Sequence, residues 1–422
     1  MTKNPTQYIE QENRFGAHNY HPLPVVLSKG PGVFVWDVEG KKYYDFLSAY
    51  SAVNQGHCHP KILKALSDQA QELTLTSRAF YNDALGPYEE YMSKLFGFDK
   101  ILPMNTGAEA VETAIKLCRK WAYEKKNIEE NQAIIVVCEG NFHGRTTTII
   151  SFSSDPDSNK NFGPYAPGFI SIPYNDIEAL KQVLKMPNIA GFLVEPIQGE
   201  AGVYTPSSDY IYQAQQLCKD HGVLFIADEI QTGIARTGSL LAVCGDCTCE
   251  KACERQTTYV RPDILIMGKA LSGGVYPISA VMADDEIMMV IQPGQHGSTF
   301  GGNPLAAKVA MAALDVVADE NLIQNARELG NIFRNEMKKI IETCDILVHV
   351  RGKGLLNAVV VNDTPESSTA WDICVALMQN GLLAKPTHGN IIRFAPPLTM
   401  TKEQLMECIS IIDNTVRNFI KK

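Results

Sequence analysis

Short apolar runs alternate with helix-sized amphipathic segments through the middle of the chain, and this alternation limits the fold more than any other feature. A strand with one wet face alternates polar and apolar residues, whereas a strand buried on both faces is apolar throughout. The runs are therefore predicted to be buried strands, and intervening segments such as residues 208–221 are predicted to be helices that cover them. We expect an α/β protein with a large, mostly parallel sheet. The predicted strands are residues 133–138, 189–194, 223–227, 263–267 and 278–282.

The chain has 422 residues, more than one hydrophobic core usually holds. We predict a large sheet domain over residues 56–305. Near the N-terminus, residues 33–38 and 41–46 alternate in the manner of a β-hairpin. Because an isolated hairpin is marginally stable in water, it needs a partner surface. We therefore predict a smaller α+β domain that combines residues 1–55 with residues 306–422.

The charge and the N-terminus of the chain bear on its partners and location. A net charge of −9 argues against a nucleic acid or an anionic membrane as partner. The sequence contains no apolar run of the length, about 18 residues, that a transmembrane helix needs. The N-terminal residues lack both an apolar signal core and the Arg-rich, acid-poor character of a transit peptide. We expect a cytosolic protein; a mitochondrial location, by way of a presequence outside this chain, stays open.

Two of the predicted strands end in residues that carry chemistry. The run at 263–267 stops at Gly268-Lys269, and the run at 223–227 stops at Asp228. Alone, such a lysine is most often solvated and such an aspartate caps a turn. Together they are the amine and the acid that pyridoxal 5'-phosphate (PLP) chemistry requires, one to form a Schiff base and one to hold a pyridinium proton. If the two strands are neighbours, both side chains emerge at one edge of the sheet.

A site for the phosphate of such a cofactor is predicted at a helix start. Thr106, Gly107 and Ala108 open a helical pattern, where free backbone N–H groups and the helix dipole favour an anion. Most Thr-Gly pairs at helix starts are only caps, so this signal is weak by itself. Thr299, in a Gly-rich loop, is a second candidate phosphate ligand.

The loop after the strand at 133–138 offers further contacts. The ring of Phe142 is suited to stacking on a pyridine, and Arg145 is suited to binding a carboxylate through two hydrogen bonds. His143 lies between them, and we expect it to be a hydrogen-bonded structural residue.

These segments resemble those of the class III, fold-type I PLP-dependent aminotransferases, and the resemblance extends from end to end. The motifs that carry it are residues 195–202, 224–233, 236–238 and 268–274. Segments 16–24, 48–60, 104–108 and 381–388 resemble the ornithine δ-aminotransferase branch of the family.

The resemblance implies a role for each matching residue. Lys269 would be the Schiff-base lysine, and Asp228 would be the partner of the ring nitrogen. Thr299 would come from a neighbouring subunit, which implies a homodimer with shared active sites. The remaining implied cofactor contacts are Gln231 to the ring hydroxyl, Phe142 on the ring, and the N–H groups of Gly107 and Ala108 on the phosphate.

The resemblance also implies the substrates. The δ-amino group of L-ornithine would pass to 2-oxoglutarate, giving glutamate and glutamate 5-semialdehyde, which cyclises to pyrroline-5-carboxylate. Tyr20 and Arg145 would bind the α-amino and α-carboxylate end, and Tyr50 would narrow the site. Glu200 and Arg393 would form an ion pair that opens when a dicarboxylate binds; a fixed salt bridge is the alternative. Segment 142–145 also resembles the N-acetylornithine aminotransferases, so an N-acetylornithine or other ω-amino-acid aminotransferase stays open.

One segment departs from the family pattern. Four of the eleven cysteines lie within ten residues, in what resembles an insertion: Cys244, Cys247, Cys249 and Cys253. Four thiols can hold Zn²⁺ or, less readily, an iron–sulfur cluster, but the spacing is not that of paired zinc knuckles, and disulfides or free thiols are equally possible. The scattered cysteines are expected to be reduced core residues. If the four-cysteine loop were the functional part, the chain would be a non-catalytic metal- or redox-sensing scaffold.

Overall fold

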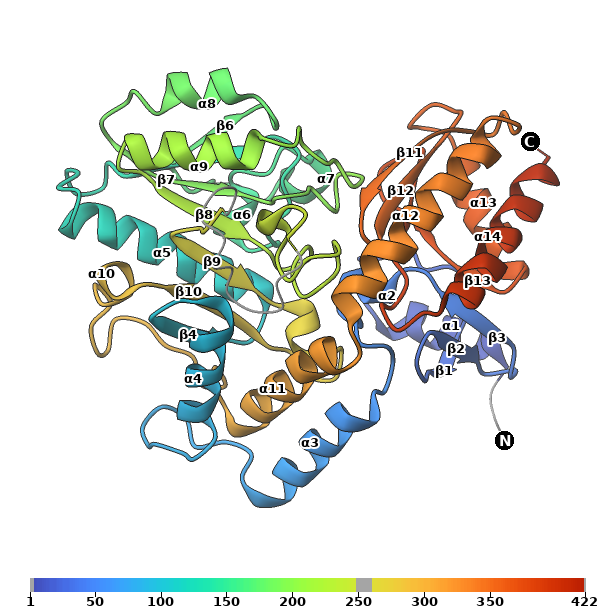
Figure 1. The fold of residues 1–422 in the computed structure, drawn as a ribbon, viewed down its shortest axis with the longest axis horizontal. Helices are drawn as coiled ribbons and strands as arrows, with labels where there is room; N and C mark the ends of the chain where they lie inside the picture. Colours follow the sequence, from blue (N-terminus) through green and yellow to red (C-terminus); the bar gives the residue numbers. More distant parts are fainter. Residues whose placement is uncertain (1–3, 248–259, 421–422) are drawn as a thin grey trace.

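The computed structural model describes residues 4–247 and 260–420. Figure 1 shows two lobes, one built around the large sheet and the other containing both termini. Within the described residues, no helix is both long enough and apolar enough to cross a lipid bilayer.

The large sheet has seven strands in the order β4-β10-β9-β8-β7-β5-β6. Strands β9, β8, β7, β5 and β6 run parallel, and β10 is antiparallel to both of its neighbours. Every residue of β7, β8, β9 and β10 is buried, which confirms the predicted fold class. The strands are β4 Lys100–Met104, β5 Ile134–Cys138, β6 Phe169–Ile172, β7 Ile189–Val194, β8 Leu224–Asp228, β9 Ile264–Met267 and β10 Ser279–Ala283.

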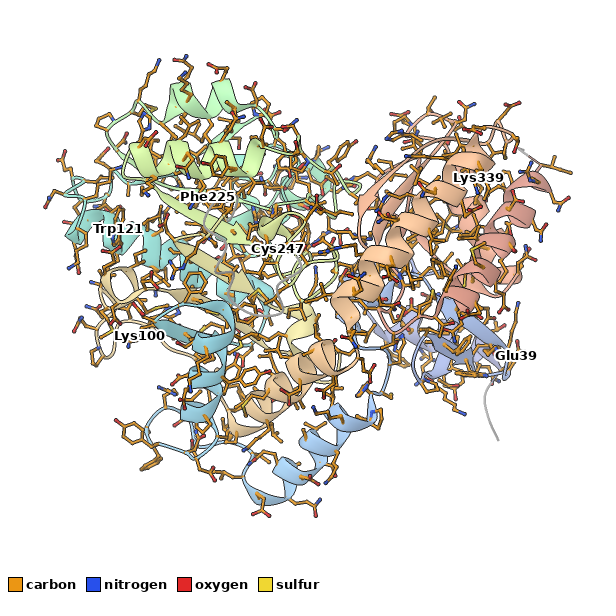
Figure 2. The ribbon with its side chains drawn as sticks, viewed as in Figure 1. Glu39, Lys100, Trp121, Phe225, Cys247 and Lys339 are labelled. Carbon is orange, nitrogen blue, oxygen red and sulfur yellow. The ribbon has the colours of Figure 1, made fainter. Side chains whose placement is uncertain are left out.

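Helices cover both faces of this sheet, and successive strand residues pack into two separate cores. Ile264 and Ile266 belong to the core under α5, whereas Leu265 and Met267 belong to the core on the other face. Figure 2 shows Phe225 of β8 inside the packed side chains, with Lys100 toward the outside. The helices of this lobe are α3 Pro60–Glu72, α4 Leu85–Phe96, α5 Gly107–Glu124, α6 Thr147–Ile150, α7 Pro156–Asn159, α8 Ile177–Val183, α9 Tyr210–Asp220, α10 Asp285–Met288 and α11 Pro304–Asp319, with 3₁₀ turns η1 Ala242–Cys244 and η2 Lys269–Ser272.

The other lobe has two four-stranded sheets, in the orders β1-β2-β3-β13 and β11-β12-β15-β14. The predicted hairpin is present as β2 and β3, and β13 from the C-terminal part pairs with β3. This pairing places N-terminal and C-terminal segments in one sheet, and the predicted domain division stays a prediction. The elements are α1 Pro5–Phe15, β1 Leu27–Lys29, β2 Phe34–Asp37, β3 Lys42–Asp45, α2 Ser48–Ser51, α12 Leu322–Ile341, β11 Leu347–Lys353, β12 Leu356–Val361, α13 Thr369–Gln379, β13 Leu382–Leu383, β14 Lys385–Pro386, β15 Ile391–Phe394 and α14 Lys402–Arg417.

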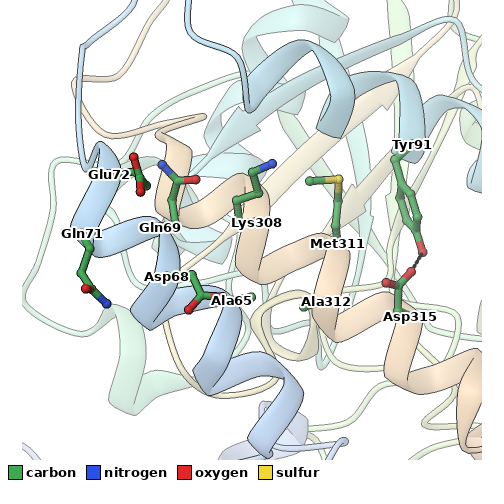
Figure 3. Close-up of a pocket in the computed structure, with 10 residues that line it drawn as sticks. All are labelled: Ala65, Asp68, Gln69, Gln71, Glu72, Tyr91, Lys308, Met311, Ala312 and Asp315. Carbon is green, nitrogen blue, oxygen red and sulfur yellow. Dashed lines mark hydrogen bonds between the residues drawn. The ribbon is translucent and has the colours of Figure 1, made fainter.

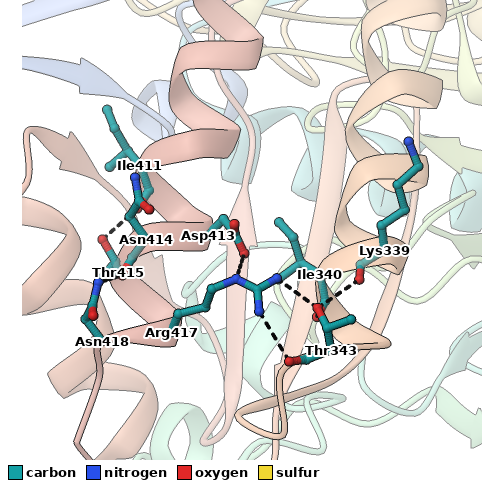
Figure 4. A network of polar contacts seen from close by, with 9 residues as sticks. All are labelled: Lys339, Ile340, Thr343, Ile411, Asp413, Asn414, Thr415, Arg417 and Asn418. Carbon is teal, nitrogen blue, oxygen red and sulfur yellow. Dashed lines mark hydrogen bonds and ion pairs between the residues drawn. The ribbon is translucent and has the colours of Figure 1, made fainter.

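An exposed arginine links the last helix to the turn after α12 (Figure 4). The Nε of Arg417 lies 2.6 Å from Oδ1 of Asp413, and its Nη2 donates to Oγ1 of Thr343 over 2.8 Å. Both ends of this network face water, so we expect it to add little stability.

A second arginine joins three distant segments and is fully buried. Nη1 of Arg236 donates to the carbonyls of Leu355 (3.0 Å) and Pro396 (2.6 Å). Its Nε and Nη2 donate to Oδ1 of Asn54 over 3.1 and 2.5 Å. Burial lowers the pKa of Arg236 to about 9, so the guanidinium still carries its charge at neutral pH. These bonds tie the loop before α3 and the ends of β12 and β15 to the large lobe.

Replacing Arg236 by methionine should destabilise the protein strongly. The change leaves three buried acceptors without donors, and we expect the free energy of unfolding to fall by about 3 kcal/mol or more. Arg417→Met is the matched control and should cost less than about 1 kcal/mol. Urea unfolding of both variants measures the difference. Equal midpoints would show that Arg236 does not join the two lobes energetically.

Candidate active site

A cavity of about 200 Å³ lies where β8 and β9 end. The two strands are parallel neighbours, with Asp228 paired to Ile266, so the chain brings Asp228 and Lys269 to the same edge of the sheet, as predicted. Six of the eight residues predicted to contact the cofactor line this cavity. They are Gly107, Ala108, Phe142, Asp228, Gln231 and Lys269.

Lys269 is held in an unfavourable backbone conformation at the start of η2. Its φ is +45°, in the left-handed region that non-glycine residues seldom adopt. Burial lowers the pKa of the Lys269 amine, the charge of Arg393 lowers it further, and Glu200 opposes the shift. A lowered pKa increases the fraction of neutral amine, which is the nucleophilic form.

Asp228 has a buried partner that sequence reasoning did not assign to it. Nδ1 of His143 donates to Oδ2 of Asp228 over 2.7 Å, and the N–H of Ile230 donates to Oδ1 over 3.0 Å. Burial alone would lower the pKa of His143, but the hydrogen bond and charge of Asp228 outweigh it and raise the pKa. His143 is hydrogen-bonded, as expected, but its partner is the central carboxylate of the site. It therefore orients Asp228.

The N-terminus of α5 also lines the cavity. The N–H groups in the first turn of a helix have no acceptor within the helix, and Gly107 and Ala108 line the cavity there. A Cβ on Gly107 would lie 3.0 Å from Cδ1 of Ile230, so glycine lets the backbone approach closely. Thr106 lies just outside the lining: its hydroxyl caps the helix by accepting from the N–H of Glu109. Its own contact with a phosphate stays a prediction.

A buried glutamate, Glu195, holds the loop of Phe142, the aromatic residue that lines the cavity. Oε1 of Glu195 accepts from the N–H of Phe142 over 2.8 Å, and Oε2 accepts from the N–H of Gly199 over 3.3 Å. Burial raises the pKa of Glu195 to about 7. Sequence reasoning included Glu195 only as part of a motif. In the structure it holds the loop that carries Phe142 against the cavity.

Arg393 pairs with Glu200 beside this cavity. Nη1 of Arg393 lies 3.1 Å from Oε2 of Glu200 and 3.5 Å from Oε1 of Gln231, and Arg393 is only 2% exposed. Burial raises the pKa of Glu200, but Arg393 and Lys269 outweigh burial and lower it. A Cβ on Gly199 would lie 1.6 Å from Oε1 of Gln231, so a larger residue there would displace the Gln231 side chain. The predicted ion pair therefore exists and borders the cofactor cavity.

A second cavity, of about 460 Å³, contains the two predicted substrate tyrosines. Tyr20 and Tyr50 both line it, and the Tyr50 ring centre lies 5.0 Å from the guanidinium carbon of Arg393. Burial raises the pKa of Tyr50, and the charge of Glu200 raises it further. Arg393 thus lies between the cavity of Lys269 and the cavity of the tyrosines.

Arg145 and Thr299 also lie outside the lining of both cavities. Arg145 is exposed, with its guanidinium carbon 5.7 Å from the Phe142 ring centre. Thr299 is exposed in the loop before α11, next to Ser298, whose hydroxyl accepts from Nδ2 of Asn105 over 2.8 Å. The predicted roles of Arg145 and Thr299 are not tested by these positions.

A larger cavity, of about 670 Å³, lies between α3 and α11 (Figure 3). It is lined by surface polar side chains such as Asp68 and Lys308, and Tyr91 donates to Asp315 there over 2.8 Å. None of the predicted site residues lines it. This cavity is therefore separate from the site that the sequence predicts.

The cysteine-rich segment is only partly described. Cys244 ends η1, and the carbonyl of Cys247 accepts from Nη2 of Arg327 over 2.7 Å. Cys249 and Cys253 lie outside the described residues, so the proposed four-thiol site stays a prediction. Within the described part, no three metal-binding side chains cluster. Of the scattered cysteines, six are buried as expected, but Cys58 is exposed.

The side chains of the smaller cavity fit PLP. A helix N-terminus suits its phosphate, an aromatic ring suits its pyridine face, and a buried carboxylate suits its ring nitrogen. Lys269 supplies an amine for its aldehyde, and Nε2 of His143 is the buried atom there without a partner among the described residues. Fold and site together define a PLP-dependent transferase of fold-type I.

The family follows from comparison with known proteins. The model of the family described as aminotransferase class-III matches residues 15–416, and the chain belongs to this family. Class-III aminotransferases use PLP as cofactor.

Three relatives show how far the similarity extends. Mitochondrial ornithine aminotransferase of Drosophila melanogaster is 58% identical, over 96% of this chain and 90% of that protein. The crystal structure of acetylornithine aminotransferase from Elizabethkingia anophelis is 66% identical with a TM-score of 0.90, covering 99% of this chain and 100% of that one. Ornithine aminotransferase from Toxoplasma gondii, whose structure shows partial occupancy of PLP at its active site, is 47% identical with a TM-score of 0.93, covering 99% and 95%.

Proposed function

We propose that the protein transfers the δ-amino group of L-ornithine to 2-oxoglutarate. The observation that carries this proposal is the Arg393–Glu200 ion pair, which lies between the Lys269 cavity and the cavity of Tyr20 and Tyr50. A site that alternates between a cationic diamine and a dicarboxylate needs an arginine whose charge can be masked and exposed. The ornithine aminotransferases among the relatives support the same substrate.

Lys269 and Asp228 would carry the chemistry. Bound PLP supplies an electron sink that lets an amino group move between an amine and a carbonyl carbon. Lys269 would take the proton from the carbon that bears the transferred amine and return it at a later step, because its lowered pKa favours the neutral base. Asp228, oriented by His143, would keep a proton at the ring nitrogen. Phe142 would cover one face of the ring, and the N–H groups of Gly107 and Ala108 would bind the phosphate.

The outer residues would orient the two substrates in turn. With ornithine bound, Glu200 neutralises Arg393, while Tyr20 and Arg145 bind the α-amino and α-carboxylate end and leave the δ-amine near Lys269. With 2-oxoglutarate bound, Glu200 would move aside and Arg393 would take a substrate carboxylate. The released glutamate 5-semialdehyde cyclises to pyrroline-5-carboxylate without help from the protein.

Turnover with three amino donors tests the proposal. Ornithine, N-acetylornithine and 4-aminobutyrate are each assayed with 2-oxoglutarate, and we expect ornithine to give the highest kcat/KM. The second candidate is N-acetylornithine, which the 66% identity to the Elizabethkingia anophelis enzyme favours. A clear preference for N-acetylornithine would refute the ornithine assignment. A protein without visible absorbance of bound cofactor and without turnover would favour the scaffold alternative.

Removing the charge of Glu200 should shift the balance between the two half-reactions. In Glu200→Gln the side chain keeps its size but no longer masks Arg393, so we expect the KM for glutamate to fall roughly tenfold. The KM for ornithine should rise, because an unmasked arginine repels the cationic substrate. Steady-state kinetics in both directions measure the effect. Unchanged KM values would support a fixed structural salt bridge.

We further propose a homodimer in which Thr299 of each subunit contacts the phosphate bound by the other. Thr299 and the neighbouring Phe300 are exposed and lie outside the lining of their own cavity, which supports this arrangement. Sedimentation equilibrium tests the dimer, and cofactor affinity of Thr299→Ala tests the contact. We also propose a cytosolic location, which cell fractionation tests.

A further inference from the structure

The segment that carries Tyr50 forms a left-handed turn. The φ angles of Ser48, Ala49, Tyr50 and Ser51 are +49°, +46°, +61° and +71°. Single residues in this region are common in turns, but each non-glycine residue there costs free energy, because Cβ approaches the following carbonyl. Four in succession, with no glycine, asparagine or aspartate among them, need support from the surrounding structure.

That support comes from a buried aspartate and from the chain that follows. Oδ1 of Asp45 accepts from the N–H groups of Leu47 (2.8 Å) and Ser48 (2.9 Å). Its Oδ2 accepts from Nε2 of His57 over 2.7 Å, and Asp45 is 7% exposed. At the other end, the N–H of Ala52 donates to the carbonyl of Ser48 over 2.8 Å. Hydrogen bonds therefore stabilise the turn at both ends.

Packing alone does not explain this turn. The hydroxyls of Ser48 and Ser51 are buried and have no hydrogen-bond partner in the described part of the chain, which adds a desolvation cost to the backbone strain. Costs of this kind persist where they serve a site. The group that the turn presents is the Tyr50 ring, which lies against Arg393 and lines the same cavity as Tyr20.

We propose that Asp45 and the left-handed turn at residues 48–51 are the positioning device that fixes the width of the substrate cavity. The turn holds the Tyr50 ring against Arg393, so that a free α-amino group fits beside Tyr20 and an N-acyl group does not. If the turn relaxed, the Tyr50 ring would leave Arg393 and the cavity would widen. This inference rests on the proposed ornithine activity and names the element that determines its selectivity.

Ala49 allows a test through the backbone. Its side chain is exposed and lines the same cavity, so a substitution there acts both through added volume and through φ. Valine and asparagine are similar in size, but asparagine tolerates the left-handed region and a β-branched residue does not. Ala49→Val should lower kcat/KM for ornithine about tenfold, mainly through KM, without lowering that for N-acetylornithine. Ala49→Asn adds a similar volume without that backbone strain, so its ratio of kcat/KM for ornithine to that for N-acetylornithine should stay within about twofold of the wild-type ratio.

The ratio of kcat/KM for ornithine to that for N-acetylornithine tests whether the turn at residues 48–51 determines selectivity. It should fall about tenfold in Ala49→Val and remain unchanged in Ala49→Asn, with the visible absorbance of bound cofactor retained in both. Equal ratios in the two variants would overturn the inference. Should Ala49→Val fail to fold, Asp45→Asn takes its place, because it weakens the hydrogen bonds from the N–H groups of Leu47 and Ser48 that hold the turn. It should lower the same ratio of kcat/KM values. An unchanged ratio in Asp45→Asn would again overturn the inference. If the proposed function is wrong, the wild-type enzyme itself will not prefer ornithine. If only this inference is wrong, the wild type will prefer ornithine and the variants will have the same ratio of kcat/KM values.

Discussion

Replacing Lys269 by alanine is expected to abolish amino transfer. The change removes the only amine that lines the cofactor cavity among the described residues, and with it both the covalent attachment of the cofactor and the base that moves the proton. We expect kcat to fall by a factor on the order of 10⁴ or more. Ornithine turnover measures the loss, and the visible spectrum of the purified variant shows whether the lysine-linked form of the cofactor is absent.

Two comparisons make this result specific. Lys269→Arg keeps a positive charge in the cavity but stays protonated, so it should be as inactive as the alanine variant. Lys308→Ala removes a lysine from the cavity between α3 and α11 and should leave turnover and spectrum unchanged. Substantial activity in Lys269→Ala would remove the lysine from the mechanism and would leave the geometry of the cavity without a chemical explanation.

The order of elements and the central pair of residues could be predicted because local signals determine them. Buried strands β7, β8 and β9 are near-continuous apolar runs, and a run that stops at a charged residue marks the edge of the sheet where loops carry function. The two edge strands were not predicted. Strand β4 contains Pro103, and strand β6 is mostly half-buried, so neither has a continuous apolar pattern.

The parts of the site that could not be predicted from the sequence depend on contacts between distant segments. His143 and Asp228 are 85 residues apart and meet because β5, β7 and β8 run parallel as neighbours, so the segments after β5 and β8 lie at the same edge of the sheet. Arg236 joins Asn54 and Pro396, and no local pattern marks either partner. The left-handed turn at residues 48–51 has no glycine to indicate a positive φ, so its strain is visible only in the folded backbone.

The pair of Asp228 and His143 underlies the second large prediction. In Asp228→Asn the side chain keeps its shape but cannot hold a proton at a ring nitrogen, so we expect kcat to fall by roughly 10³. The variant should still fold, because the amide oxygen of the substituted side chain can accept the hydrogen bond from His143.

The same substitution should change how stability depends on pH. In the wild type the pKa of His143 is raised above its usual value of 6.5, so the protonated imidazole stabilises the fold below that pH, and this contribution disappears as pH rises through the raised pKa. Without the charge of Asp228, burial dominates and lowers the pKa of His143, so in the variant this histidine no longer stabilises the fold and instead lowers its stability as pH falls below 6.5. Unfolding free energies of wild type and variant should therefore diverge as pH falls below about 6.5 and converge at higher pH, while Asp413→Asn, on the exposed face of α14, should follow the wild type throughout. A variant that transfers amino groups at the wild-type rate, or whose unfolding free energy runs parallel to that of the wild type at every pH, would show that Asp228 supports the site only by its shape.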